Sequence, residues 1–125
     1  MTPGDPLLSA RARVLRDLAA EGAVDPHTVS LVEECVAQRR WWLSQWAQGS
    51  AYVEGLVAQD VQDALFDEAR RWPVCASCPD PVEHSLSIEP ELGPDPHWVC
   101  SESGAVIAPL GHLAMRASEP GAQPD

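Results

Sequence analysis

Apolar residues recur at helical spacing through the first part of the chain and predict two helical stretches. The first covers residues 6–21 and begins after Asp5, whose carboxylate can accept hydrogen bonds from the free amides of a first turn. Pro6 fits the first helical position because its missing N–H loses no helical bond there, and Gly22 is expected to end the helix. We expect the apolar face of this helix to comprise Leu8, Ala12, Leu15 and Ala19.

The second stretch begins at Asp25-Pro26 in the same way and continues to Trp72. Because a glycine inside a helix costs about 1 kcal/mol relative to alanine, Gly49 favours a break over one helix spanning 26–72. The first helix is too short to cover the whole apolar stripe, so we expect another protein or a second copy of the chain to pack on it. The stripe keeps close to a 3.6-residue period and comprises Val29, Val32, Val36, Leu43, Ala47, Val53, Val57, Val61, Ala64 and Leu65.

The pattern changes after Trp72, where six prolines between residues 73 and 96 exclude a helix. Short β-prone segments follow, and strands are predicted at 84–88, 97–100 and 105–108. These elements predict an α+β fold in which an α-helical hairpin or bundle precedes a small zinc-ribbon-like antiparallel β module. The predicted parts are a helical region over 1–72, the β module over 73–113 and a disordered tail over 114–125.

Three of the four cysteines lie in the β module and have the spacing of a metal site. Cys75 and Cys78 form a C-x-x-C pair, and Cys100 follows after a further strand-like segment. Thiolates from one such turn and a second, distant turn can enclose a tetrahedral zinc ion. A structural zinc held by these cysteines is one interpretation. The other is a degenerate ribbon that folds without metal, because Ser103 occupies the place of the expected fourth cysteine.

A histidine is the natural substitute for that missing thiolate. We prefer His84 as the fourth ligand, since His97 and Cys100 would point to opposite faces of one strand. Asp80 is a third possibility, and His112 is a more distant one. Thioredoxin-like redox chemistry is not expected, because prolines rather than a helix follow the C-x-x-C pair.

Charge narrows the classes of partner. The chain of 125 residues carries a net charge of −11, and residues 72–125 contribute one arginine against eight acidic residues. A nucleic-acid-binding ribbon needs cations for the phosphates, so nucleic acid is not an expected partner. No apolar run approaches the roughly 18 residues of a membrane span, and the N-terminus lacks the pattern of a secretory signal. We therefore expect a cytoplasmic protein that does not contact membranes.

Tryptophans form the second notable cluster, with Trp41, Trp42 and Trp46 following Arg39-Arg40. The favoured interpretation places them in the core where the helices meet the β module. The alternative is an exposed anchor for a protein partner, because Trp and Arg dominate interface hot spots. Cys35 lies beside the apolar stripe and is expected to be a small buried residue.

Residues 60–113 resemble a group of small actinobacterial proteins to which no activity is assigned. The shared motifs are Asp-Val-Gln-Asp-Ala at 60–64, Trp-Pro-x-Cys at 72–75, Trp-x-Cys at 98–100 and Ile-Ala-Pro-Leu-Gly at 107–111. Where that group tends to have His-Pro-His-Pro, this chain has Cys78-Pro-Asp80-Pro. The resemblance implies a metal-binding module in which Cys78 replaces one zinc ligand by another.

No catalytic constellation is visible in the sequence, and we assign no catalytic residue. The metal ligands expected are Cys75, Cys78, Cys100 and His84. The leading hypothesis is a non-enzymatic interaction or adaptor protein whose C-terminal module is clipped by structural zinc. A zinc-dependent hydrolase with an open coordination position is the alternative, with Glu102 or His84 as general base. An acidic inhibitor that mimics nucleic acid is a further one.

Overall fold

The computed structural model of the chain describes residues 5–76, 83–90 and 92–114. Most of the tail predicted over 114–125, together with Cys78 and Asp80, lies outside these residues. Three α-helices come first, with a 3₁₀ helix between the second and the third, and three β-strands follow. In chain order they are α1 (Pro6–Ala20), α2 (Pro26–Gln45), η1 (Ala47–Ala51), α3 (Val53–Asp67), β1 (Leu86–Glu89), β2 (His97–Cys100) and β3 (Val106–Pro109).

Helix α1 begins where the sequence predicts, but it buries a different face. Asp5 caps it by accepting from the backbone N–H of Leu7 at 2.9 Å. The predicted apolar face is wrong, because Leu8 is exposed together with Ala12 and Ala19. The face that packs into the core consists of Leu7, Ala10, Val14, Asp17 and Leu18. A carboxylate therefore lies in the middle of the buried face.

The long helical stretch is interrupted around Gly49, as the sequence predicts. Helix α2 ends at Gln45, and η1 carries the chain through Gly49 into α3. A Cβ atom on Gly49 would lie 2.5 Å from Cη2 of Trp42, so the indole ring packs directly on the glycine backbone. Only glycine fits this corner without moving the ring. Among the described residues, no helix combines the length and the apolar character that crossing a membrane requires.

Helix α3 ends at Asp67, and the prediction that helix continues to Trp72 is wrong. Ala69 adopts a left-handed conformation with φ 62°. Its N–H donates to the carbonyl of Phe66, and the N–H of Arg70 donates to the carbonyl of Leu65. These two bonds form a Schellman C-cap with alanine where glycine is usual, so the sequence carries no glycine to mark the end.

The strands form an antiparallel sheet in the order β1-β2-β3. Leu86 lies opposite Cys100 and Ile88 opposite Trp98, and the side chains of these four residues are buried. The predicted segment 97–100 matches β2, whereas β1 and β3 are shifted toward the C-terminus by one or two residues. Three N-terminal helices followed by this sheet confirm the predicted α+β arrangement.

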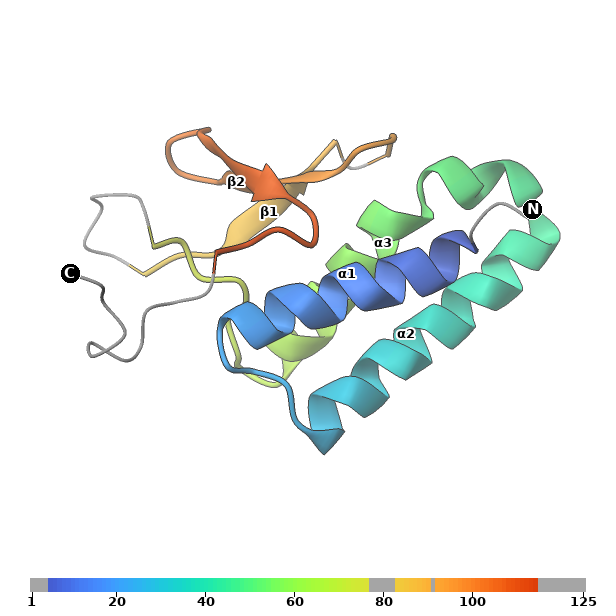
Figure 1. Cartoon of the computed structure of the whole chain (residues 1–125), viewed down its shortest axis with the longest axis horizontal. Helices are drawn as coiled ribbons and strands as arrows, with labels where there is room; N and C mark the ends of the chain where they lie inside the picture. Colours follow the sequence, from blue (N-terminus) through green and yellow to red (C-terminus); the bar gives the residue numbers. More distant parts are fainter. Residues whose placement is uncertain (1–4, 77–82, 91, 115–125) are drawn as a thin grey trace.

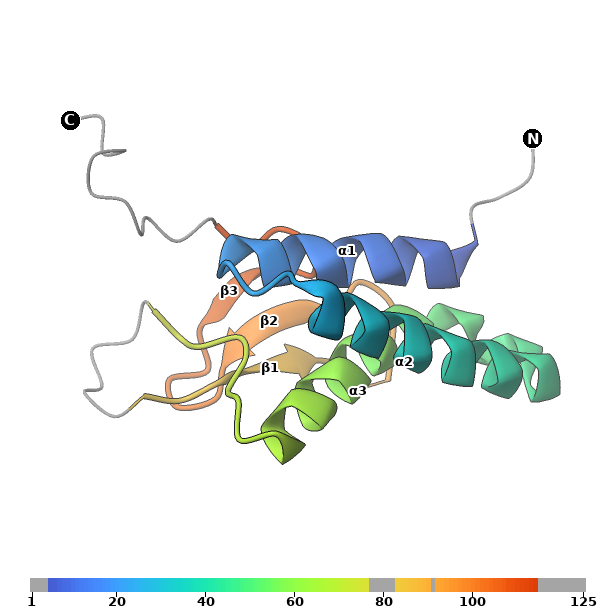
Figure 2. The same cartoon turned by 90° about the horizontal axis from the view of Figure 1, so that it is seen from below.

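The sheet covers one side of α1 and α3, and α2 packs on the opposite side (Figures 1 and 2). Val32, Val36, Val53, Val57, Val61 and Leu65 of the predicted apolar stripe are consequently buried within the chain itself. The first helix alone does not cover the whole stripe, as expected, but the sheet supplies a second covering layer within the same chain (Figures 1 and 2). Self-association or a protein partner stays a prediction, but this stripe no longer motivates it.

Candidate metal centre

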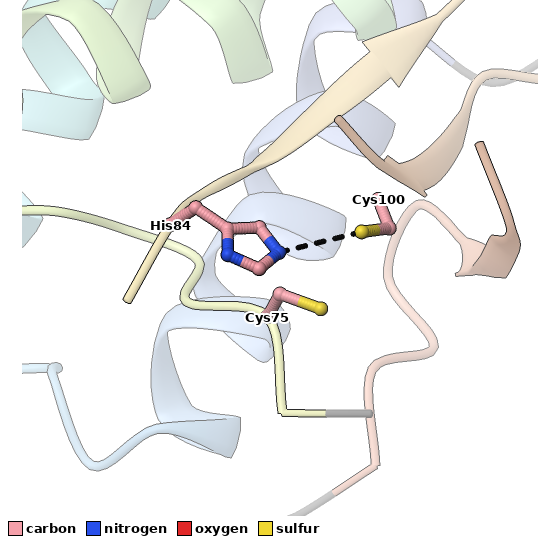
Figure 3. A group of neighbouring side chains, drawn as sticks. All are labelled: Cys75, His84 and Cys100. Carbon is pink, nitrogen blue, oxygen red and sulfur yellow. Dashed lines mark hydrogen bonds between the residues drawn. The ribbon is translucent and has the colours of Figure 1, made fainter. Parts of the chain in front are cut away.

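Three of the predicted metal ligands converge at one end of the sheet. Cys75 lies in the segment that follows α3, His84 lies two residues before the start of β1, and Cys100 ends β2. Their ligand atoms all lie within 4.8 Å of one another. Figure 3 shows Nε2 of the His84 imidazole directed at the sulfur of Cys100, with the thiol of Cys75 on the same side of the ring. Nε2 of His84 lies 3.4 Å from Sγ of Cys100. The preference for His84 over the other histidines is thus supported by the geometry.

Backbone pairing brings these three segments together. Val74 forms an isolated antiparallel bridge with Ser85, and the N–H of Cys75 donates to the carbonyl of His84 at 2.8 Å. On the other side of β1, Leu86 lies opposite Cys100. The segment 73–75 therefore runs along one edge of β1 while β2 runs along the other. The carboxylate of Glu21, at the end of α1, holds this segment by accepting from the N–H of Val74 at 3.0 Å.

Cys100 begins a tight turn whose donors point at its sulfur. The N–H of Ser103 donates to the Cys100 sulfur at 3.3 Å, and Gly104 closes the turn with a positive φ of 78°. Hydrogen bonds from the hydroxyl and N–H of Ser103, with a further contribution from His84, lower the pKa of the Cys100 thiol to about 6. Ser103, which occupies the place of the expected fourth cysteine, therefore favours the thiolate form of Cys100 that a metal requires.

The geometry fits a metal ion better than a disulfide. Zinc bond lengths of about 2.3 Å to sulfur and 2.0 Å to nitrogen give a tetrahedral S–N edge of about 3.5 Å, close to the 3.4 Å between Cys100 and His84. Because β1 lies between the strand segments that carry the two cysteines, their backbones are about two strand spacings apart, roughly 9–10 Å. A disulfide needs Cα atoms within about 7 Å.

Among the described residues, the other candidate histidines do not join this cluster. Cys78 and Asp80 lie outside the described residues. His97 begins β2 and its Nδ1 atom lies 2.7 Å from the carbonyl of Asp95, so the structure excludes it from the cluster around Cys100. His112 lies beyond β3, where it lines a pocket together with residues of α1, among them Arg16.

Asp17 is the polar residue of greatest structural consequence, and sequence reasoning missed it. The side chain is fully buried, and it accepts from the indole N–H of Trp98 at 2.7 Å and from the backbone N–H groups of Gly111 at 2.6 Å and Leu113 at 3.0 Å. Trp72 packs edge-on against Trp98, with ring centroids 5.3 Å apart. This carboxylate joins α1 to β2 and to the turn after β3. The signal was present, because Asp17 falls on the helical face of Leu7, Ala10, Val14 and Leu18.

The tryptophans at the end of α2 do not lie in the core at the junction of the helices and the β module, which is where the sequence favoured placing them. Trp41 and Trp46 are 67% and 42% exposed, at the end of α2 that adjoins η1, and they do not form the junction with the β module. Trp42 is half-buried and packs edge-on against Trp46, while the guanidinium of Arg39 lies 5.0 Å from its ring centroid. The core interpretation is therefore wrong for Trp41 and Trp46. The aromatic junction between helices and sheet is formed by Trp72 and Trp98 instead.

Comparison with known proteins gives one match. The family model described as a domain of unknown function (DUF8819) matches residues 4–110, a range that includes all three helices, all three strands and the three converging ligands. A search of curated proteins finds no match, and neither does a search of solved structures. Because the matched range covers most of the 125 residues, the chain belongs to the DUF8819 family.

Proposed function

We propose that the protein is a non-enzymatic interaction protein whose β module is held together by a structural zinc ion. The observation that carries this proposal is the convergence of Cys75, His84 and Cys100 from three separate segments. Two thiols and one imidazole are ligands that suit zinc, which is borderline-soft and tetrahedral. A zinc ion bound there would link the edge segment, β1 and β2.

Cys78 is the fourth ligand in this proposal. It follows Cys75 by three residues, the spacing at which a C-x-x-C turn directs both sulfurs at one ion. With Cys78 the set becomes Cys₃His, which fills all four positions and leaves none for a reacting water. A closed site of this kind contributes folding free energy, because the unfolded chain holds no preformed site.

The interaction role is supported by the aromatic end of α2. Trp41 and Trp46 expose large apolar rings, and the guanidinium of Arg39 lies over the neighbouring ring of Trp42. Tryptophan and arginine are among the residues most enriched in interface hot spots. The rings of Trp42 and Trp46 pack on the backbone of Gly49, which restricts the positions of these two side chains. Rigid aromatic side chains lose little conformational entropy when a partner binds.

The test of the zinc site is metal analysis of the purified full-length protein and of single variants. We expect one zinc per chain, and loss of most of it in Cys75→Ser, Cys78→Ser, His84→Ala and Cys100→Ser. Cys35→Ser is the matched control, since Cys35 is a buried thiol in α2 outside this cluster. A protein that is metal-free as purified, and whose stability zinc and chelators leave unchanged, would contradict the proposal.

Two further measurements address the role. If Cys78→Ser keeps its zinc with unchanged affinity, the fourth position is open and the hydrolytic alternative gains. The interaction role is tested by quantitative capture of partners from a host lysate on wild-type protein and on Trp41→Ala/Trp46→Ala. A partner retained equally by both proteins would show that the aromatic end is not the binding surface.

A further inference from the structure

A cationic pocket lies between α1 and the turn that follows β3, on a part of the molecule that the metal centre does not use. Its volume is about 240 Å³. The lining residues of α1 are spaced by three or four positions and so share one face of the helix, and the turn forms the opposite wall. The lining residues are Ser9, Ala12, Arg13, Arg16, Gly111 and His112.

Buried contacts fix the geometry of this pocket. The carboxylate of Asp17 accepts from the N–H groups of Gly111 and Leu113, which anchors the turn on both sides of His112. Gly111 has a φ of 91°, and a Cβ atom there would lie 2.8 Å from Cγ of Arg13. The stem of Arg13 therefore packs against the bare glycine backbone, and the turn and helix form one preorganised unit.

The charge of the pocket contrasts with that of the chain. The protein has a net charge of −11, yet the lining contains two arginines, a histidine and a serine and includes no carboxylate. Arg13 lies 3.3 Å from a carboxylate oxygen of Glu54, and this single contact leaves most of its five donors available. Within the described part of the chain, Arg16 forms no ion pair or hydrogen bond.

We propose that this pocket binds a small phosphate-bearing anion, either inorganic phosphate or a small phosphate monoester. Arginine guanidinium groups match the geometry of phosphate oxygens and donate to two of them at once. The hydroxyl of Ser9 and the ring of His112 supply further donors at the rim. A volume of about 240 Å³ is below the range of roughly 300–1,000 Å³ typical of drug-sized ligands, which favours an anion without a large organic group.

The experiment is calorimetric titration of the full-length protein, zinc-loaded if it binds zinc, with inorganic phosphate and with glycerol 3-phosphate at low ionic strength. We expect saturable binding that weakens about tenfold in Arg16→Gln, because a hydrogen bond to a charged group is lost. Binding should also weaken as ionic strength rises. The two titrants distinguish the source, since tighter binding of either one identifies free phosphate or the ester as the preferred form.

Arg11→Gln is the matched control. Arg11 lies on the same helix and also carries a full charge, but it is paired with Glu33 at 2.7 Å and does not line the pocket. If phosphate binding weakens equally in Arg11→Gln and Arg16→Gln, the loss comes from the change in net charge and not from a contact in the pocket. That result would overturn the proposal. The absence of saturable binding by either titrant to the folded wild-type protein would also overturn it.

Discussion

Replacing Asp17 by asparagine changes the most buried charged group of the fold without changing its size. The carboxylate accepts three hydrogen bonds, from the indole of Trp98, from Gly111 and from Leu113, and every donor is an N–H group. Asparagine offers one oxygen and one NH₂ group. If its oxygen takes the place of Oδ2, which serves Trp98 and Gly111, the NH₂ group faces the N–H of Leu113.

The expected loss follows from these three bonds. One buried donor without an acceptor costs about 1–3 kcal/mol, and two bonds that lose the help of a formal charge cost about 1 kcal/mol each. The neutral amide in turn avoids part of the desolvation cost of a buried carboxylate. We therefore expect Asp17→Asn to lower the free energy of unfolding by about 2 kcal/mol. Asp17→Ala, which leaves all three donors without an acceptor, should cost about 3–5 kcal/mol, because each buried donor that loses its acceptor costs about 1–3 kcal/mol.

Urea unfolding followed by circular dichroism measures this difference in the free energy of unfolding directly. In thermal unfolding, each kcal/mol of lost stability should lower Tm by roughly 3–5 °C for a chain of this size. Asp67→Asn is the control, since it removes an exposed carboxylate at the end of α3. All variants are compared at the same metal content. If Asp17→Asn is as stable as Asp67→Asn, the hydrogen bonds of this carboxylate do not stabilise the junction and the reasoning fails.

Three further predictions concern other parts of the fold. Gly111→Ala should destabilise the protein by about 1 kcal/mol more than Gly104→Ala, because both have a positive φ but only Gly111 lies against Arg13; urea titration of both variants checks this. Gly49→Ala should displace the Trp42 ring and change the near-ultraviolet circular dichroism, and an unchanged spectrum would contradict that packing. Burial, with a smaller effect of Asp60, raises the pKa of the Cys35 thiol to about 11. The folded state therefore keeps this proton above pH 9, where the unfolded chain has released it, so the free energy of unfolding should fall between pH 9 and 11. Measurement against Cys35→Ala, which should lack this part of the slope, isolates the effect.

Local signals in the sequence were sufficient for the helix starts and for the break. Asp5-Pro6 and Asp25-Pro26 are N-cap devices that act within one turn, and Gly49 interrupts the helix by a local propensity. The end of α3 was missed because Ala69 takes a backbone conformation that usually requires glycine. The hydrogen bonds of the C-cap accompany this conformation, and residue propensity alone does not predict them.

The candidate site was also predictable only as far as local signals in the sequence reach. Cysteine spacing pointed to Cys75 and Cys100, and alternation along a strand separated His97 from Cys100. The role of Ser103 as a donor to the Cys100 sulfur depends on the turn that follows β2, and spacing does not reveal it. The buried faces of α1 and α3 depend on the sheet, which is the last part of the chain and covers these helices on the side opposite to α2 (Figures 1 and 2). Helical periodicity alone therefore left their covering unassigned.

The hydrogen bonds of Asp17 also set the order in which the protein can reach its native state during synthesis. Asp17 lies in α1, and its hydrogen-bond partners lie 81 to 96 positions further along the chain. At about 5–20 residues per second, translation takes roughly 5–20 s to reach them. During this interval α1 and α3 can form and meet, but the carboxylate stays hydrated and the face that receives the sheet stays open. A nascent chain that ends before Gly111 is thus expected to remain protease-sensitive, and the last few core residues to be synthesised complete the fold.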